Sequence, residues 1–83
     1  MKHTHYAVAM DWASEYETGS SIVGIKHTID EALKLFNETV EEERELAIEN
    51  EWTIYDDLDD RFDAGKEGYY AASHVVIYIQ IVE

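Results

Sequence analysis

The segment between residues 29 and 49 constrains the fold of this 83-residue chain more than any other feature. When its residues are placed at about 100° per residue around a helix axis, the apolar ones fall within roughly 100° of one another. These apolar residues are Ile29, Ala32, Leu33, Phe36, Val40 and Ala47. Directly before and within the first turn, Thr28-Ile29-Asp30-Glu31 matches a capping box. The sequence therefore predicts one helix from about 29 to 49 whose apolar stripe is buried against another layer.

Two segments have the period of a β-strand, His5–Ala13 and His74–Val82, because apolar side chains recur at every second position. A polar loop from Glu15 to Ser20 separates the first of them from a shorter predicted strand, Ser21–His27. The expected core joins the helix stripe to one strand face, made of Tyr6, Val8, Met10, Trp12, Val75, Ile77, Ile79 and Ile81. The opposite face carries Ala7, Ala9, Val76, Tyr78 and Val82. We expect either residues 52–70 or a second copy of the chain to cover that semi-apolar face.

The segment 52–64 has two interpretations. Trp52 to Tyr55 fits a short strand, whereas Ile54, Leu58 and Phe62, spaced four residues apart, fit a short helix. Gly65 and Gly68 are expected to end whichever element precedes them. The order β-β-α-(β)-β predicts an α+β fold, a small antiparallel sheet with one long helix packed on one face, in a single domain over residues 1–83.

Composition excludes several classes of protein. With 46% hydrophobic and 12% aromatic residues, the chain is too apolar for a disordered acidic tail. It has no cysteine, which excludes disulfides and thiolate metal sites. No stretch approaches the roughly 18 consecutive apolar residues of a membrane-spanning helix, and no long apolar run follows Met1. We therefore expect a cytoplasmic protein that does not enter the membrane.

Negative charge dominates the chain, with 19 Asp and Glu against 6 Lys and Arg, for a net charge of −13. Such a surface repels nucleic acid and anionic membranes and attracts basic proteins. On the predicted helix, six glutamates project opposite the apolar stripe: Glu31, Glu38, Glu41, Glu42, Glu45 and Glu49. Only Lys34 dilutes them, while Glu43 falls on the apolar side. This face is either a solvated surface or a docking surface for a basic partner.

A second acidic cluster follows the helix and includes Asp56, Asp57, Asp59, Asp60 and Asp63. Calcium prefers such oxygen ligands, but an EF-hand loop requires Gly at its sixth position, and a loop starting at Asp57 has Phe62 there. The cluster is a solvated acidic loop, a calcium site of other geometry, or an extension of the helix surface. We take the last as our hypothesis and predict no metal site. The predicted partner-binding residues are Glu38, Glu41, Glu42, Glu45, Glu49, Asp56, Asp57, Asp59 and Asp60.

The histidines and hydroxyls give no catalytic signature. His3 and His5 have the i, i+2 spacing of some zinc sites, and with His27 and His74 a four-histidine site is an alternative to four exposed polar residues. The chain contains no GxSxG sequence, phosphate-binding loop or dinucleotide fingerprint. We therefore expect neither an enzyme nor a cofactor.

The acid excess, the single helix over a small sheet, and the segment Gly68-Tyr69-Tyr70-Ala71-Ala72-Ser73-His74 before a hydrophobic strand carry a resemblance. The chain resembles small acidic uncharacterised proteins of bacteria, phages and mobile elements, and in type it is similar to phage anti-defence proteins such as anti-CRISPR proteins. The expected function is a non-enzymatic interaction protein that occupies a basic, nucleic-acid-binding surface of a partner protein. It would bind neither nucleic acid nor membrane directly. The alternative is a small homodimeric domain that self-associates through its second sheet face.

Overall fold

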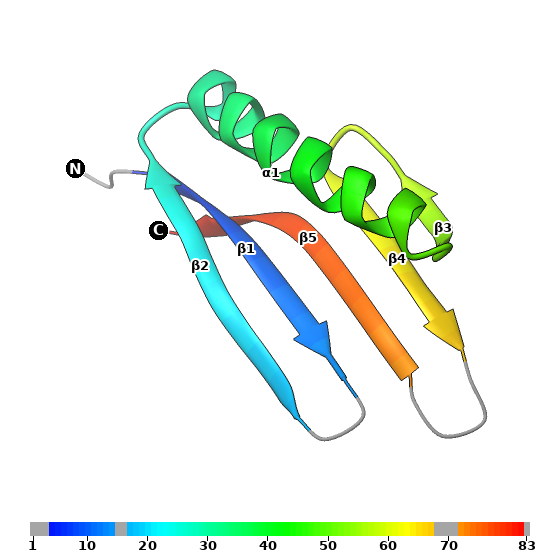
Figure 1. Cartoon of the computed structure of the whole chain (residues 1–83). Coiled ribbons are helices and arrows are strands. Elements are labelled where there is room, and N and C mark those ends of the chain that lie inside the picture. Colours follow the sequence, from blue (N-terminus) through cyan, green and yellow to red (C-terminus); the bar gives the residue numbers. More distant parts are fainter. Residues whose placement is uncertain (1–3, 15–16, 68–71, 83) are drawn as a thin grey trace.

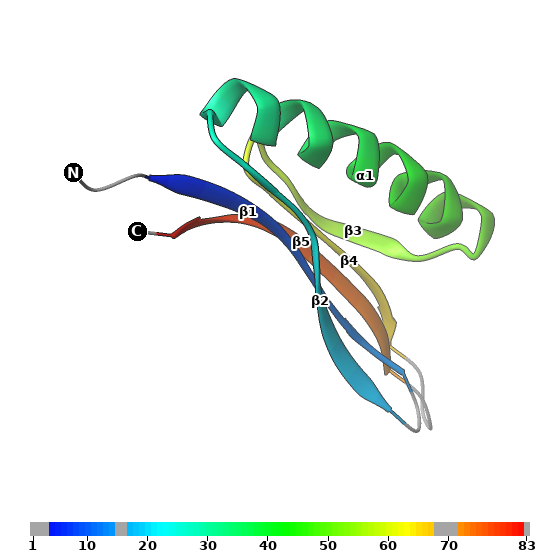
Figure 2. The same cartoon turned by 90° about the vertical axis from the view of Figure 1, so that its left-hand side faces the viewer.

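The computed structural model describes residues 4–14, 17–67 and 72–82. Its elements are β1 (His5–Ala13), β2 (Thr18–Lys26), α1 (Ile29–Glu49), β3 (Thr53–Asp57), β4 (Arg61–Glu67) and β5 (Ala72–Val82). The strands form one antiparallel sheet in the order β2-β1-β5-β4-β3 (Figure 1). Helix α1 lies across one face of this sheet (Figure 2). The predicted α+β fold is therefore confirmed.

Helix α1 begins and ends at the predicted residues because both ends have local caps. At the start, the Thr28 hydroxyl accepts the backbone N–H of Glu31 at 3.2 Å and donates to the Glu31 carboxylate at 2.9 Å. At the end, the Asn50 side chain donates to the carbonyl of Leu46 at 2.8 Å. The next residue, Glu51, has a left-handed φ of 59°, which turns the chain back towards β3.

The core lies between α1 and the centre of the sheet. Phe36 from the helix, Phe62 from β4 and Ile77 from β5 are among its largest fully buried side chains. The strand register explains this grouping, because Phe62 lies opposite Ile77 in the β4–β5 pair. The buried cluster consists of Val8, Ala32, Phe36, Val40, Ala47, Phe62, Ala64, Val75 and Ile77.

Gly24 lets the helix approach the edge of the sheet. A Cβ at this position would lie 2.6 Å from Cδ2 of Leu35, closer than real contacts allow. A side chain there would therefore displace the Leu35 side chain, which packs against the core.

The segment 52–64 forms strands, so the short-helix interpretation is wrong. Thr53–Asp57 and Arg61–Glu67 pair as β3 and β4, with a turn in which the N–H of Leu58 donates to the carbonyl of Arg61 at 2.8 Å. Gly65 does not end an element but lies within β4, where a Cβ would come within 2.8 Å of the Ser73 carbonyl oxygen. A glycine in this strand reflects close backbone approach to β5.

Two other strands are longer than predicted. Strand β2 begins at Thr18 rather than Ser21 and ends at Lys26, and β5 begins at Ala72 rather than His74. Polar Thr and Ser extend these strands because backbone pairing with β1 and β4 continues there. Tyr69 and Tyr70 lie outside the described residues.

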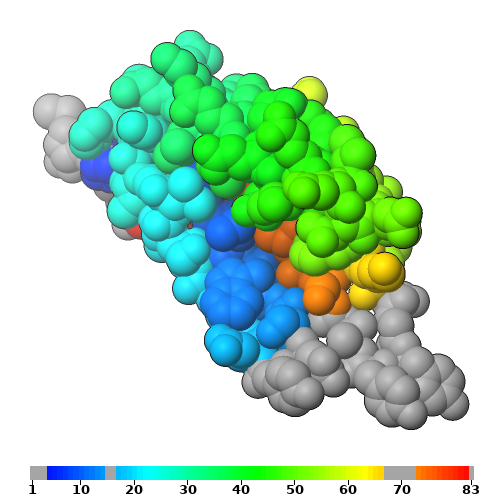
Figure 3. All heavy atoms as spheres, in the orientation of Figure 1, coloured from blue at the N-terminus to red at the C-terminus, as the bar shows by residue number. Residues whose placement is uncertain are grey.

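Three residues expected in the core are exposed instead: Trp12 at 37%, Ile29 at 43% and Ile81 at 63%. The far ends of β1 and β2 extend beyond the helix, which covers only part of the sheet (Figure 3). Trp12 lies in that part and packs against Gly19, where a Cβ would come within 2.3 Å of the indole ring. The position of α1 over the sheet, and not the strand pattern alone, thus decides how far the core extends towards Trp12.

The opposite sheet face has no covering layer within the described part of the chain. Residues 52–67 do not provide the cover expected of the segment 52–70, whose residues 68–70 lie outside the described ranges. Strands β3 and β4 extend the sheet sideways instead of folding beneath it (Figure 2). Ala7 and Ala9 on this face are nevertheless buried, at 1% and 2% exposure. Both are small residues between larger cross-strand neighbours; Ala9, for example, lies between Ile22 and Tyr78. The face therefore stays open with an apolar centre.

We expect Phe36→Ala to lower the free energy of unfolding by about 3–5 kcal/mol, because the ring is 1% exposed and its removal leaves a cavity. Leu46→Ala is the matched control on the same helix. Leu46 is 48% exposed, so its replacement should lower the free energy of unfolding only slightly. Urea titration of both variants measures the difference. A loss below about 1 kcal/mol for Phe36→Ala would contradict the placement of the helix stripe.

Candidate functional site

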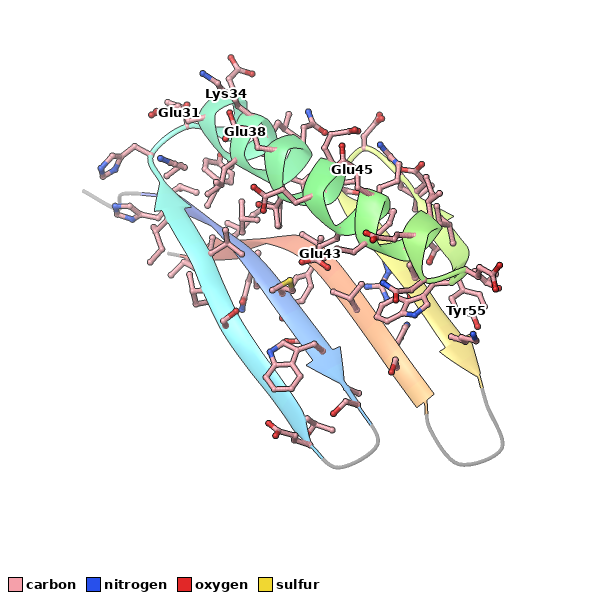
Figure 4. All side chains as sticks on the ribbon, viewed as in Figure 1. Glu31, Lys34, Glu38, Glu43, Glu45 and Tyr55 are labelled. Carbon is pink, nitrogen blue, oxygen red and sulfur yellow. The ribbon has the colours of Figure 1, made fainter. Side chains whose placement is uncertain are left out.

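The glutamates predicted to project outward are all exposed. Figure 4 shows two of them, Glu38 and Glu45, on the side of α1 that faces away from the sheet. We call this surface the acidic helix face; it consists of Glu31, Glu38, Glu41, Glu42, Glu45 and Glu49. Lys34 lies near its N-terminal end, beside a hollow that it shares with Glu31 and Glu38. No basic residue occupies the last turn of the helix. The negative charge is therefore least diluted in the C-terminal half of α1.

Arg44 is turned from this face towards the edge of the sheet. Its guanidinium donates to the carboxylate of Asp57 at 2.6 Å, also contacts that of Glu41, and lies 5.7 Å from the centre of the Phe62 ring. The helix and β3 are thereby joined across 13 residues of sequence. Four further glutamates of the acidic helix face have no ion-pair partner among the described residues: Glu38, Glu42, Glu45 and Glu49.

The Asp-rich segment does not form one surface. Asp57 lies opposite Phe62 on the helix side of the sheet, whereas Asp56 lies opposite Asp63 on the other side. Arg61 contacts both of the latter, at 3.6 Å from Asp56 and 3.5 Å from Asp63. Part of this acidic cluster is thus neutralised internally, and its members face in different directions.

Asp59 and Asp60 form the exposed turn between β3 and β4. The turn follows directly after Asp57, which is bound to Arg44 of the helix. Of the Asp residues predicted to bind a partner, Asp57 is therefore joined through Arg44 to Glu41 of the acidic helix face, and Asp59 and Asp60 follow it in the chain. Asp56 does not join them. Sequence reasoning missed Arg44 as the link, because its two carboxylate partners lie on different elements.

The histidines do not converge. The rings of His5 and His27 lie 5.0 Å apart between centroids, at the end of the sheet where β1 begins. His74 lies opposite Ala13 at the other end of β1 and contacts the carboxylate of Asp63. Within residues 4–14, 17–67 and 72–82, no group of three or more His, Asp or Glu side chains is arranged to hold a metal ion. His3 lies outside the described residues.

Glu43 differs from the other glutamates of the helix because it points towards the sheet (Figure 4). The side chain is half-buried, and this burial raises the pKa of its carboxyl above the ordinary value of 4.5. The neighbouring charge of Glu42 raises the pKa further. The carboxylate form of Glu43 is therefore less stable in the folded state than in water.

Comparison with known proteins gives no match: no family model fits the chain, and no curated protein or solved structure is significantly similar to it. Within the described residues, no helix has both the length and the apolar character needed to cross a bilayer.

Glu43→Gln should raise the melting temperature at pH 7 and have no such effect below pH 4.5. A carboxyl whose folded-state pKa is raised contributes stability when protonated, and this stability is lost as the pH rises through the folded-state pKa. Glutamine stays neutral, so the loss disappears. Glu38→Gln, with the same change in net charge on the outward face, is the control. Equal pH profiles for the two variants would contradict the burial of Glu43.

Added sodium chloride should raise the melting temperature at neutral pH. Neighbouring carboxylates such as Glu38 and Glu42 repel one another, and salt screens exposed charges over a Debye length of about 10 Å at 0.1 M. Scanning calorimetry at low and high salt measures the shift. A marked fall would mean that attractive pairs such as Arg44–Asp57 dominate the electrostatics instead.

Proposed function

We propose that this protein is a non-enzymatic interaction protein whose acidic helix face occupies a basic, nucleic-acid-binding surface of a partner protein. The observation that carries the proposal is the row of exposed carboxylates on α1, of which all but Glu41 have no ion-pair partner among the described residues. Opposite charges three or four residues apart stabilise a helix, and the outward side of α1 has few such pairs.

The dimensions of the face suit the role. At about 1.5 Å per residue, Glu31 to Glu49 spans roughly 27 Å along the helix axis. Packing of the apolar stripe on the sheet holds the helix backbone beneath the row in a fixed orientation, so little backbone conformational entropy is lost on binding. A rigid row of negative charges of this length is similar in charge to one strand of phosphates. Such a surface would compete with nucleic acid for the same basic groove.

Electrostatics would act mainly on the rate of association. A net charge of −13 accelerates encounter with a basic surface and disfavours contact with nucleic acid or an anionic membrane. The turn at Asp59 and Asp60 would extend the contact beyond the helix. If the partner is a nuclease or another nucleic-acid-binding component of a defence system, the protein would act as its inhibitor.

The test is competition with DNA. The immobilised chain captures proteins from a nuclease-treated bacterial lysate, and a captured protein is then bound to a fluorescent DNA duplex. We expect the wild type to displace the duplex, and Glu38→Gln with Glu42→Gln and Glu45→Gln to require on the order of tenfold higher concentrations at low salt. Glutamine keeps helix propensity, so the fold should survive.

A control variant removes the same number of charges elsewhere. Asp11→Asn, Glu17→Gln and Asp56→Asn together also change the net charge from −13 to −10. This variant should displace the duplex nearly as well as the wild type, because its charges lie away from the acidic helix face. If both triple variants compete equally, or if the wild type leaves the duplex bound, the acidic helix face is only a solvated surface.

A further inference from the structure

The two edges of the sheet differ in charge. Strand β3 forms one edge, and its short sequence includes Asp56 and Asp57. Charged residues on an edge strand oppose pairing with another chain. Strand β2 forms the other edge, and from Thr18 to Ile25 it has no charged residue and no proline, in a chain in which 30% of the residues are charged. One edge is thus protected by charge and the other is neutral.

The neutral edge is also exposed. Most side chains between Thr18 and Ile25 are exposed, including Ile22 at 55% and Ile25 at 58%. Among the described residues, no strand pairs with the outer side of β2 (Figure 1). From Thr18 to Ile22 the strand pairs regularly with β1, before a bulge at Val23. The regular part presents its remaining backbone N–H and C=O groups outward, ready to pair.

We propose that β2 pairs antiparallel with β2 of a second copy of this chain, about a two-fold axis close to Ser21, so that one sheet continues through both copies. Two chains of net charge −13 repel one another, and an approach along a charge-free strand places no like charges opposite each other.

The charges at the two ends of the strand are complementary in this arrangement. Lys26 is the last residue of β2, and the exposed Glu17 directly precedes the first residue, Thr18. Antiparallel pairing brings the Lys26 end of each copy to the Glu17 end of the other, whereas parallel pairing would bring the two lysines together. A second copy therefore fits this edge better than an arbitrary extended peptide does.

The helices would then lie on the same side of the joined sheet. The part of α1 that contacts the Lys26 end of β2 is its N-terminal part, where Lys26 and Lys34 line one hollow. The more acidic C-terminal half lies over β4 and β3, away from the seam (Figure 1). Pairing along β2 thus leaves both acidic helix faces exposed and keeps their most acidic parts apart.

Light scattering over a dilution series tests the pairing. We expect the wild type to show about twice the monomer mass of 9.6 kDa at high concentration. Ser21→Glu places two carboxylates at the axis and should restore the monomer mass. Thr53→Glu, the corresponding change on the exposed β3 edge, should leave the dimer intact. Circular dichroism checks that both variants remain folded.

A charge swap tests the antiparallel register. Lys26→Glu should weaken the dimer by roughly tenfold, because two attractive pairs become repulsive. Adding Glu17→Lys to the same chain should restore the wild-type dissociation constant. A double variant as weak as Lys26→Glu alone would overturn the register.

Tyr78→Glu separates edge pairing from stacking of the open sheet faces. Tyr78 lies on that face two strands from the seam, so the edge dimer should tolerate the change. A dimer that is broken by Tyr78→Glu and unaffected by Ser21→Glu would overturn the proposal in favour of face stacking. A monomeric wild type at every concentration would overturn it outright. Neither result bears on binding of a basic partner, which the DNA competition measures.

Discussion

Burial of the apolar stripe of α1 against the centre of the sheet is the interaction on which the rest of the structure depends. Phe36, Phe62 and Ile77 come from a helix and two strands and meet in one fully buried cluster. This packing fixes the rotation of the helix about its axis. Because the apolar side faces the sheet, the glutamates on the opposite side must face solvent. The same contact thus stabilises the fold and positions the candidate partner-binding surface.

Electrostatics in this protein oppose compactness in some places and support it in others. The carboxylates of the acidic helix face repel one another, and Glu43 is held half-buried with a raised pKa. Against this, Arg44 links Glu41 to Asp57, and Arg61 links Asp56 to Asp63. Both arginines are thus bound to carboxylates at or near the β3 edge, and Lys34 lies beside the acidic helix face, which stays strongly negative. A surface of this kind favours fast encounter with a basic partner over broad contact.

The sheet is asymmetric in both its faces and its edges. One face is covered by α1, whereas the other has an apolar centre without a covering layer in the part of the chain that the structure describes. One edge carries aspartates, and the other has no charged residue from Thr18 to Ile25. A neutral edge and an acidic helix face allow a division of roles, with self-association along β2 and partner binding on α1.

The elements that depend on local periodicity and local caps could be predicted from the sequence. Strand β1 and helix α1 begin and end as predicted, and the outer glutamates of α1 are exposed, because periods of two and 3.6 residues fix which side chains share a face. Tertiary structure alone decided that residues 52–67 form two strands and that Phe62 joins the core. It also decided which of two neighbouring aspartates faces the helix. Successive strand residues point to opposite faces, and the bulge between Ile54 and Asp56 shifts the register by one residue, so that Asp57 and not Asp56 lies on the helix side. Such pairings depend on contacts distant in sequence, which no local pattern contains.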